Sequence, residues 1–218
     1  MKKILLLALL AASTGAARAQ SIAAGTVSLG GSIGYSRSSS ETEINTGRNP
    51  YTIEFTTSRF QFAPAAGYFI ADNLAVGLNL SYLAERTTQS NGSPGQPDPD
   101  SPDARTNLRV GPYVQYYKML SEQFGVLGTL GAGYQNSVVP GTNNSAETKA
   151  TGFYADHTPG VIFFPIPKFG ISASIGNLGY NRLNIDLDGN SNTASTNTFG
   201  ASFGFDQLQF GGTYFFGR

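Results

Sequence analysis

Apolar and polar residues alternate without a break from Leu74 to Tyr82. Every second residue is large and apolar, and the residues between them are Ala, Gly, Asn and Ser. A repeat of two predicts a β-strand with one apolar face. The opposite face is small and uncharged, whereas a strand exposed to water usually carries charged side chains there. This combination indicates a strand with lipid on one side and the lumen of a barrel on the other.

The same texture predicts eight strands along the chain. Their expected ranges are 25–37, 52–69, 74–86, 106–118, 124–137, 149–164, 169–182 and 196–216. In most of them the large apolar residues share one parity, as Leu108, Val110 and Val114 do. Tyrosines are expected to form the aromatic girdles at the two membrane interfaces. The candidates are Tyr35, Tyr68, Tyr82, Tyr116, Tyr134 and Tyr180.

The connections between the expected strands alternate in length. Three are short, at 70–73, 120–122 and 165–168, and four are long and polar, at 38–51, 87–105, 138–148 and 183–195. Short periplasmic turns and long extracellular loops are typical of outer-membrane barrels. With an even number of strands, both termini lie on the periplasmic side. The expected fold is all-β, an eight-stranded antiparallel up-and-down transmembrane β-barrel.

Three strands carry a local conflict of parity. Residues 53–55 have the opposite parity to residues 60–62, which indicates either a bulge at 56–58 or a strand that starts beyond the bilayer. Residues 161–164 are apolar on both faces. The last strand changes phase at 206–207. A bulge there preserves one long strand and an even total, which bacterial single-chain barrels favour.

The first 19 residues have the organisation of a secretory signal peptide. Its basic, apolar and cleavage-site parts are, in order, Lys2 and Lys3, residues 4–12, and Ala17 and Ala19. The alternative, an uncleaved anchor, is disfavoured because the apolar run is far shorter than the roughly 20 residues of a spanning helix. We expect the mature chain to begin at Gln20, which leaves residues 20–218 as one outer-membrane β-barrel domain.

Composition supports a membrane barrel rather than a soluble domain. Charged residues make up 13% of the chain, against about 25% in ordinary soluble domains. There is no cysteine, which excludes a disulfide scaffold and a cysteine-linked lipoprotein. Loss of the three basic residues of the signal peptide takes the formal charge from zero to −3. Nucleic acid is therefore not an expected partner.

Two segments carry a resemblance to a known family. Residues 67–78 read Gly-Tyr-Phe-Ile-Ala-Asp-Asn-Leu-Ala-Val-Gly-Leu, and residues 208–216 are an aromatic-rich last strand followed by Gly217 and Arg218. The chain resembles small bacterial outer-membrane β-barrel proteins of the OmpA/OmpX-like type, above all the barrel-only outer membrane protein beta-barrel domain group. The resemblance implies a place in the bacterial outer membrane, contact with its lipid, and recognition of the last strand by the barrel-assembly machinery.

Four charged residues are candidates for an ion-pair network inside the upper barrel. If the short turn after the second strand is centred near residue 72, Arg59 lies opposite Glu85 on the polar face. Arg109 and Asp156 reach a similar height when residues are counted from their turns. Because buried charges need partners, these side chains are expected to close the lumen and neutralise one another. A gate or a narrow ion path is the alternative.

No catalytic or metal-binding constellation stands out. His157 is the only histidine, and on a strand its neighbour Asp156 points to the other face, so a hydrolytic pair is not expected. The aspartates of the proline-rich segment 93–103 favour a solvated loop over a Ca²⁺ site. Residues 186–190 lack the glutamate of a calcium loop. We expect no enzymatic activity, no cofactor and no bound metal.

The lumen is expected to be narrow and mostly blocked. Eight strands leave an interior only just wide enough for side chains, and the inward positions combine many Gly and Ser residues with Tyr113, Tyr117 and Tyr154. The expected function is a structural or surface-interaction role, with the extracellular loops as the contact surface. The alternatives are a narrow channel or small-ligand-binding porin-like barrel, an outer-membrane lipid-modifying enzyme, and a secreted soluble barrel.

Overall fold

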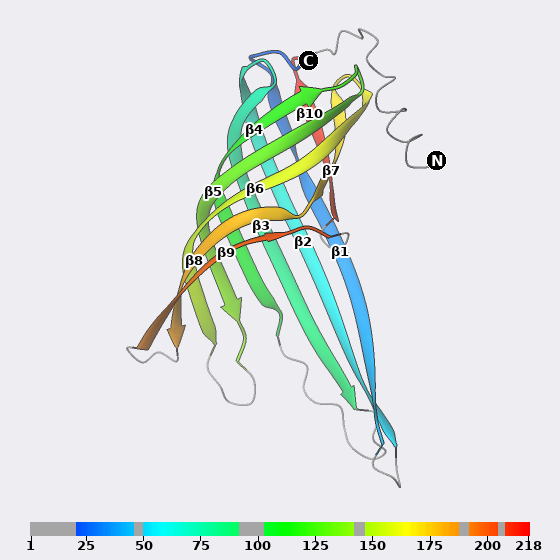
Figure 1. The fold of residues 1–218 in the computed structure, drawn as a ribbon, viewed down its shortest axis with the longest axis vertical. Coiled ribbons are helices and arrows are strands. Elements are labelled where there is room, and N and C mark those ends of the chain that lie inside the picture. The colour runs from blue at the N-terminus through cyan, green and yellow to red at the C-terminus, as the bar shows by residue number, and fades with distance from the viewer. Residues whose placement is uncertain (1–20, 46–49, 92–102, 142–146, 188–191, 205–207) are drawn as a thin grey trace, which may run out of the picture.

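The structure, a computed structural model, describes residues 21–45, 50–91, 103–141, 147–187, 192–204 and 208–218, and the regular secondary structure of these residues consists of β-strands (Figure 1). The strands are β1 (Val27–Ile44), β2 (Tyr51–Ala71), β3 (Leu74–Asn91), β4 (Arg105–Met119), β5 (Phe124–Val139), β6 (Thr148–Ile166), β7 (Phe169–Ile175), β8 (Asn177–Leu187), β9 (Asn192–Ser202) and β10 (Leu208–Phe216). No helix among these residues is long and apolar enough to cross a membrane. The predicted signal peptide and its cleavage site before Gln20 lie outside the described residues.

Eight of the strands close into an antiparallel ring. β1 to β7 follow one another as neighbours, β7 pairs with β10, and β10 returns to β1 with Val27 opposite Phe216. The predicted eight-stranded antiparallel barrel is therefore confirmed. The start of β1 and the end of β10 lie at the end of the barrel that carries the short turns, at the top of Figure 1. We call this the turn end and the opposite end the loop end.

Two further strands, β8 and β9, correct the predicted ranges of the last two strands. The predicted strand 169–182 is broken at Gly176, whose φ of 67° lies in the left-handed region that favours glycine. β7 pairs with the part of β6 nearer the turn end, and β8 pairs with the part nearer the loop end. The predicted strand 196–216 is likewise two strands, β9 and β10, with different neighbours. The phase change at 206–207 falls outside the described residues.

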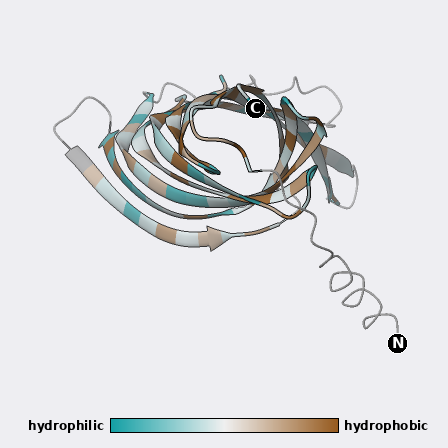
Figure 2. Cartoon of the chain, turned by 90° about the horizontal axis from the view of Figure 1, so that it is seen from above, coloured by the Kyte–Doolittle hydropathy of each residue, from teal (hydrophilic) through white to brown (hydrophobic). Residues whose placement is uncertain are grey.

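Large apolar side chains cover the outer wall of the barrel. Apolar and polar positions alternate along the strands, as the colours of Figure 2 show. Leu78, Phe153 and Phe199 are 65%, 67% and 74% exposed. The candidate girdle residues are also exposed, namely Tyr35, Tyr68, Tyr82, Tyr116, Tyr134 and Tyr180. Because water-soluble monomers rarely expose so continuous an apolar surface, this belt fits contact with lipid.

The strand registers resolve two of the parity conflicts. β2 keeps an unbroken register with β1 through residues 51–68, so no bulge interrupts 56–58. The apolar residues 53–55 belong instead to a strand that continues beyond the lipid-facing belt. On β6, Ile162 and Phe164 are buried inside the barrel while their neighbours face outward. The double apolar face of this segment therefore reflects lipid on one side and a packed interior on the other.

The strands reach further toward the loop end than the alternation predicted. β1 continues to Ile44, β2 begins at Tyr51 and β3 continues to Asn91, inside segments expected to be loops. The predicted loop 183–195 is also mostly strand, because β8 and β9 leave only residues 188–191 between them. In Figure 1 the β1–β3 sheet extends well past the ends of β4, β5 and β6. A three-stranded sheet thus projects beyond the belt.

Two glycines inside the barrel make room for one large ring. Gly67 and Gly77 are register partners on β2 and β3, and Tyr113 of β4 lies against both. A Cβ atom at Gly77 would overlap the carbonyl oxygen of Ala66 and lie 2.7 Å from the Tyr113 ring. Both glycines of the family-like segment 67–78 are therefore explained by the packing of this tyrosine.

Replacing Gly77 with alanine is expected to lower the free energy of unfolding by about 1–3 kcal/mol. Either the β2 backbone at Ala66 or the Tyr113 ring must shift to make room for the added methyl group. Gly34→Ala on β1 is the matched control, since a Cβ there meets nothing closer than Gln61 Cβ at 3.9 Å. Urea unfolding of the refolded barrel in lipid vesicles measures both variants. Equal unfolding midpoints would contradict this packing.

Candidate functional site in the barrel lumen

The lumen is closed at the turn end by a layer of aromatic side chains. Phe69, Tyr117, Phe164 and Phe215 are at most 2% exposed, and the contacting rings have centroids 5.2–6.2 Å apart. These aromatic side chains come from β2, β4, β6 and β10, one from each strand. These are the four strands of the closed barrel that run toward the turn end. Aliphatic neighbours complete the cluster, namely Ile22, Ala75, Met119, Leu127 and Ile162. We call this layer the aromatic floor.

The segment before β1 is fixed against the aromatic floor. Ile22 is fully buried. Its N–H donates to Asn73 Oδ1 at 2.8 Å, and the Asn73 N–H donates to the Ile22 carbonyl at 2.9 Å. The Ala24 N–H donates to Asp72 Oδ1 at 3.0 Å. Asn73 has a φ of 63°, which asparagine adopts more readily than most residues. The turn after β2 therefore both reverses the chain and holds the N-terminal segment.

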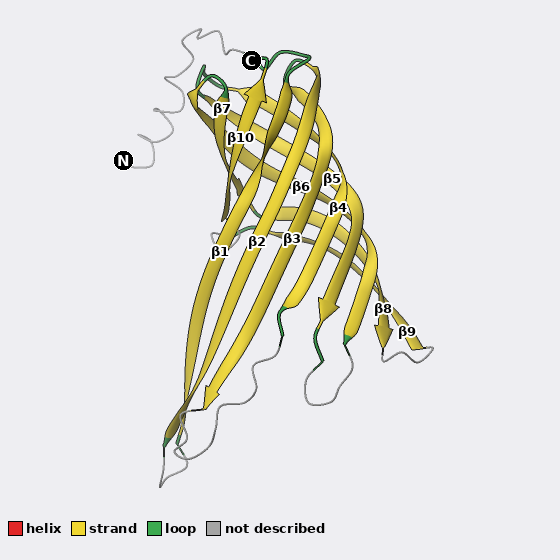
Figure 3. Cartoon of the chain, turned by 180° about the vertical axis from the view of Figure 1, so that it is seen from behind, coloured by secondary structure: helices red, strands yellow, loops and turns green. Residues whose placement is uncertain are grey.

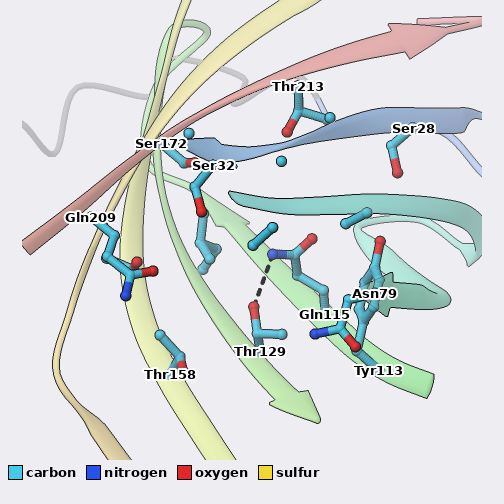
Figure 4. Close-up of a pocket in the computed structure, with 17 residues that line it drawn as sticks. Ser28, Ser32, Asn79, Tyr113, Gln115, Thr129, Thr158, Ser172, Gln209 and Thr213 are labelled. Carbon is cyan, nitrogen blue, oxygen red and sulfur yellow. Dashed lines mark hydrogen bonds between the residues drawn. The ribbon is translucent and has the colours of Figure 1, made fainter. Parts of the chain in front are cut away.

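A cavity of about 210 Å³ lies in the lumen next to the floor (Figure 4). We call it the middle cavity. All eight strands of the ring contribute to its lining. The lining consists of hydroxyl, amide and tyrosine side chains, with Gly, Ala and one Leu between them, and it contains no Asp, Glu, Lys, Arg or His. The cavity therefore offers both polar and apolar surface but no charged side chain.

Hydrogen bonds fix one wall of the middle cavity. Gln115 Nε2 donates to Thr129 Oγ1 at 2.9 Å, and the Tyr117 hydroxyl donates to Gln115 Oε1 at 2.7 Å. Since Tyr117 also belongs to the aromatic floor, these bonds tie the cavity wall to the closed end of the lumen.

An ion pair borders the middle cavity on its loop side. Arg109 Nη1 donates to Asp156 Oδ2 at 3.4 Å, and Arg109 Nη2 donates to Asn181 Oδ1 at 3.3 Å. The guanidinium carbon lies 5.0 Å from the centroid of the Tyr154 ring. The Tyr154 hydroxyl in turn donates to Asn79, which lines the cavity. The Arg109 and Asp156 side chains are only 27% and 20% exposed, so the pair is partly shielded from water.

The other two candidate charges do not join this pair. Arg59 and Glu85 are register partners on β2 and β3, at inward positions of both strands. Within the described chain, no ion pair links them to each other or to Arg109 and Asp156. The structure therefore brings together one pair of the four charges and not a four-membered network.

The residues considered for catalysis or metal binding do not converge. Asp156 faces the lumen, whereas His157 has the opposite parity and lies beside Leu130 and Leu178 on the outer wall. The described residues contain no group of three or more His, Cys, Asp or Glu side chains that could hold a metal ion. Most of the aspartate-containing segments considered for Ca²⁺ lie outside the described residues.

One carboxylate beyond the belt is stabilised by two hydroxyls. The Ser39 hydroxyl donates to Glu54 Oε1, and the Thr56 hydroxyl donates to the same oxygen at 3.2 Å. These bonds, that of Ser39 first, favour the ionised form and lower the pKa of Glu54 below its ordinary value. The stabilisation that the ionised Glu54 carboxylate provides is therefore fully present above its ordinary pKa. It is lost as the pH falls through the lowered pKa of the folded protein.

The barrel wall is not hydrogen-bonded all the way to the loop end. β1 pairs with β10 only as far as Ser32 and Gly211. Beyond them, among the strands that the structure describes, β1 pairs only with β2 and β9 only with β8. Figures 1 and 3 show the β8–β9 hairpin and the β1–β3 sheet diverging toward the loop end. Because Ser32, Gln209 and Gly211 line the middle cavity, the cavity lies where the wall parts.

The alternation alone did not predict the aromatic floor or the hydrogen bonds of Asp72 and Asn73 that hold the N-terminal segment against it. The parity did contain a signal, because all four floor aromatics occupy inward positions near the turn end of a strand. Asp72 and Asn73 were predicted only as turn residues. Ile22, an apolar residue just after the expected cleavage site, was the one sign that the N-terminal segment packs against the barrel.

Comparison with known families decides the classification. The family described as "Outer membrane protein beta-barrel domain" matches residues 4–206, nearly the whole chain. The chain belongs to this family. The resemblance seen in the hairpin 67–78 is thereby confirmed. No curated protein matches the chain.

A solved structure supports the same fold for this outer membrane protein beta-barrel domain. The crystal structure of the outer membrane protein OprG from Pseudomonas aeruginosa is similar, with a TM-score of 0.52 and 16% sequence identity. The match covers 90% of this chain and 98% of that chain. At this level of identity the likeness shows the fold alone, so the function of this family member must be argued from its own lumen and surface.

Proposed function

We propose that the protein is a non-conducting barrel of the bacterial outer membrane, with a structural and surface-interaction role. The observation that carries the proposal is the aromatic floor. A channel needs a continuous water path, and at the turn end the buried rings of Phe69, Tyr117, Phe164 and Phe215 fill the lumen. Ile22 adds a further buried side chain to this layer. Membership of the family supports the outer membrane as the location.

The loop end is the part of the molecule available for contact with partners. Short turns belong to the periplasmic side of such barrels, so the projecting β1–β3 sheet faces the outside. Its exposed residues are mainly polar or charged, and include Arg37, Glu41 and Arg86. Segments held by a rigid scaffold commonly carry binding functions. The sheet and the connecting loops are therefore the proposed contact surface.

Planar-bilayer recording tests the absence of conduction. The purified full chain is expected to give the current of bare lipid, while a porin reconstituted in the same way shows that the membrane detects channels. Stepwise single-channel currents from the wild-type protein would overturn the proposal. Heat-dependent mobility on a denaturing gel, measured on the same preparation, confirms that the barrel is folded.

We also propose that the protein is not an enzyme and needs no cofactor. The support is the separation of His157 and Asp156 on opposite faces of β6. Hydrolysis of phospholipid by the reconstituted protein that disappears in a His157→Ala variant would contradict this. The proposed partners are outer-membrane lipid along the apolar belt and the barrel-assembly machinery at β10.

A further inference from the structure

We propose that the middle cavity binds a small, uncharged, polyhydroxylated molecule such as a monosaccharide or a sugar alcohol. Its volume of about 210 Å³ is well above the roughly 10–15 Å³ that one water molecule needs in a cavity. This space suits a compact ligand and excludes an oligosaccharide from the cavity itself. The assignment does not depend on whether the barrel conducts, because it rests on the chemistry of the lining.

The charge of the lining decides against ions. No acidic or basic side chain lines the cavity. A charged ligand that moved from water into the cavity would therefore find no opposite charge there. The nearest ion pair, Arg109 with Asp156, is already internally neutralised. Amino acids, phosphates and carboxylates therefore fit the site poorly. An apolar ligand fits no better, since it would leave the hydroxyl and amide groups of the lining without hydrogen-bond partners.

Hydroxyl groups without a protein partner point to the ligand's chemistry. Five lining side chains have no hydrogen-bond partner within the described part of the chain, namely Ser32, Thr158, Ser172, Ser174 and Thr213. They come from β1, β6, β7 and β10 and form one side of the cavity. A hydroxyl both donates and accepts a hydrogen bond. A ligand with several hydroxyls of its own can both donate hydrogen bonds to these side chains and accept hydrogen bonds from them.

The opposite wall is rigid and partly apolar. Gln115 is held between Thr129 and Tyr117, and Tyr113 is held against Gly67 and Gly77. Figure 4 shows Gln115 and Tyr113 across the cavity from Thr158 and Ser172. An aromatic ring offers a flat apolar surface, which matches the C–H face of a sugar ring. Side chains fixed before binding reduce the ordering cost of binding.

Access to the cavity is from the outer side. The aromatic floor closes the turn end, whereas the cavity lies where β1 and β10 stop pairing at Ser32 and Gly211. Gln209 of β10 beside this point is exposed, and its Nε2 donates to Gln61 Oε1 of β2, the strand on the other side of β1, at 3.3 Å. Since the aromatic floor closes the turn end, a ligand enters and leaves through the loop end of the lumen, which makes the cavity a capture site rather than a step in transport.

Ligand titration of the full chain in lipid nanodiscs tests the proposal. The probes are D-glucose, D-xylose, sorbitol and glycerol, with D-gluconate and D-glucosamine as ionised counterparts of similar size. Backbone amide shifts near Thr158, Ser172 and Thr213 are expected to saturate with at least one uncharged probe, with a Kd of about 1–10 mM for about 12 ligand atoms. The ionised probes are expected to bind at least about tenfold more weakly. Absence of saturation with all four uncharged probes, or equal binding of the ionised ones, would overturn the proposal.

Removal of hydroxyls at constant shape assigns the site. Thr158→Val with Thr213→Val is expected to weaken binding of the best probe about tenfold, because two neutral hydrogen bonds are lost. Thr151→Val, on the outward face of the same strand as Thr158, is the matched control and should bind as the wild type does. Ser174→Ala, expected to weaken binding by about threefold, replaces the double variant if that variant does not refold. Unchanged affinity in a folded hydroxyl variant would remove the cavity as the site.

Discussion

Replacing Phe215 with alanine is expected to lower the free energy of unfolding by about 3–5 kcal/mol. Phe215 is fully buried, and its ring centroid lies 5.2 Å from that of Phe164, 6.1 Å from Phe69 and 6.2 Å from Tyr117. Removal of the Phe215 ring leaves a void among the floor side chains. The strands that carry these side chains are each hydrogen-bonded to their neighbours in the barrel, so they cannot move inward to fill the void. Urea unfolding in lipid vesicles, followed by tyrosine fluorescence, measures the loss.

The adjacent residue provides the control for this experiment. Phe216 lies on the outer wall and is 51% exposed, so lipid can fill the space of the lost ring, and Phe216→Ala is expected to lose about 1.5–3 kcal/mol without an added cavity term. Refolding from urea takes place without the assembly machinery, and the comparison therefore reports packing and not recognition of the last strand. Equal losses for the two variants would show that the aromatic floor is not a tightly packed layer.

The turn at 70–73 shows why much of the fold could be predicted from the sequence. A short turn and a period of two together determine which residues of two strands face each other. The same turn places Arg59 opposite Glu85, and the register continues as far as Ile53 and Asn91. The alternation also predicted the outer wall, because every strand meets the same apolar surroundings on that side.

The β8–β9 hairpin shows where this reasoning stops. The odd-numbered apolar positions of β7 end at Ile175, and the even-numbered ones of β8 begin at Leu178, so the sequence does carry a phase change around Gly176. β6 nevertheless serves as the neighbour of both strands. Alternation reports the surroundings of each face and not the identity of the neighbouring strand. The separation of β9 from β1 was therefore not predictable from it.

The middle cavity could not be located from the sequence for a related reason. Ser and Thr residues occur along the whole chain, and only the closure of the ring decides which of them converge. Ser32 and Thr213 meet because β1 pairs with β10, which joins residues far apart in the sequence. By contrast, Arg109 and Asp156 could be matched in height by counting from their turns, since each count spans a single strand.

Replacing Asp156 with leucine is expected to lower the free energy of unfolding by about 2–3 kcal/mol. The change leaves the Arg109 guanidinium in the lumen without its carboxylate partner, and a cation that is mostly shielded from water is costly when unpaired. The value lies below that of a fully buried pair because the two side chains retain 27% and 20% exposure. Urea unfolding in lipid vesicles measures the loss.

A double variant separates the cost of the unpaired charge from loss of packing. Arg109→Met together with Asp156→Leu removes both charges and should recover most of the stability lost in Asp156→Leu alone. The exposed pair of Lys149 and Glu147, with N and O atoms 3.3 Å apart, is the matched control. Glu147→Gln there should change the free energy of unfolding by less than about 0.5 kcal/mol. If the double variant is as unstable as Asp156→Leu, the ion pair is not what stabilises the loop side of the middle cavity.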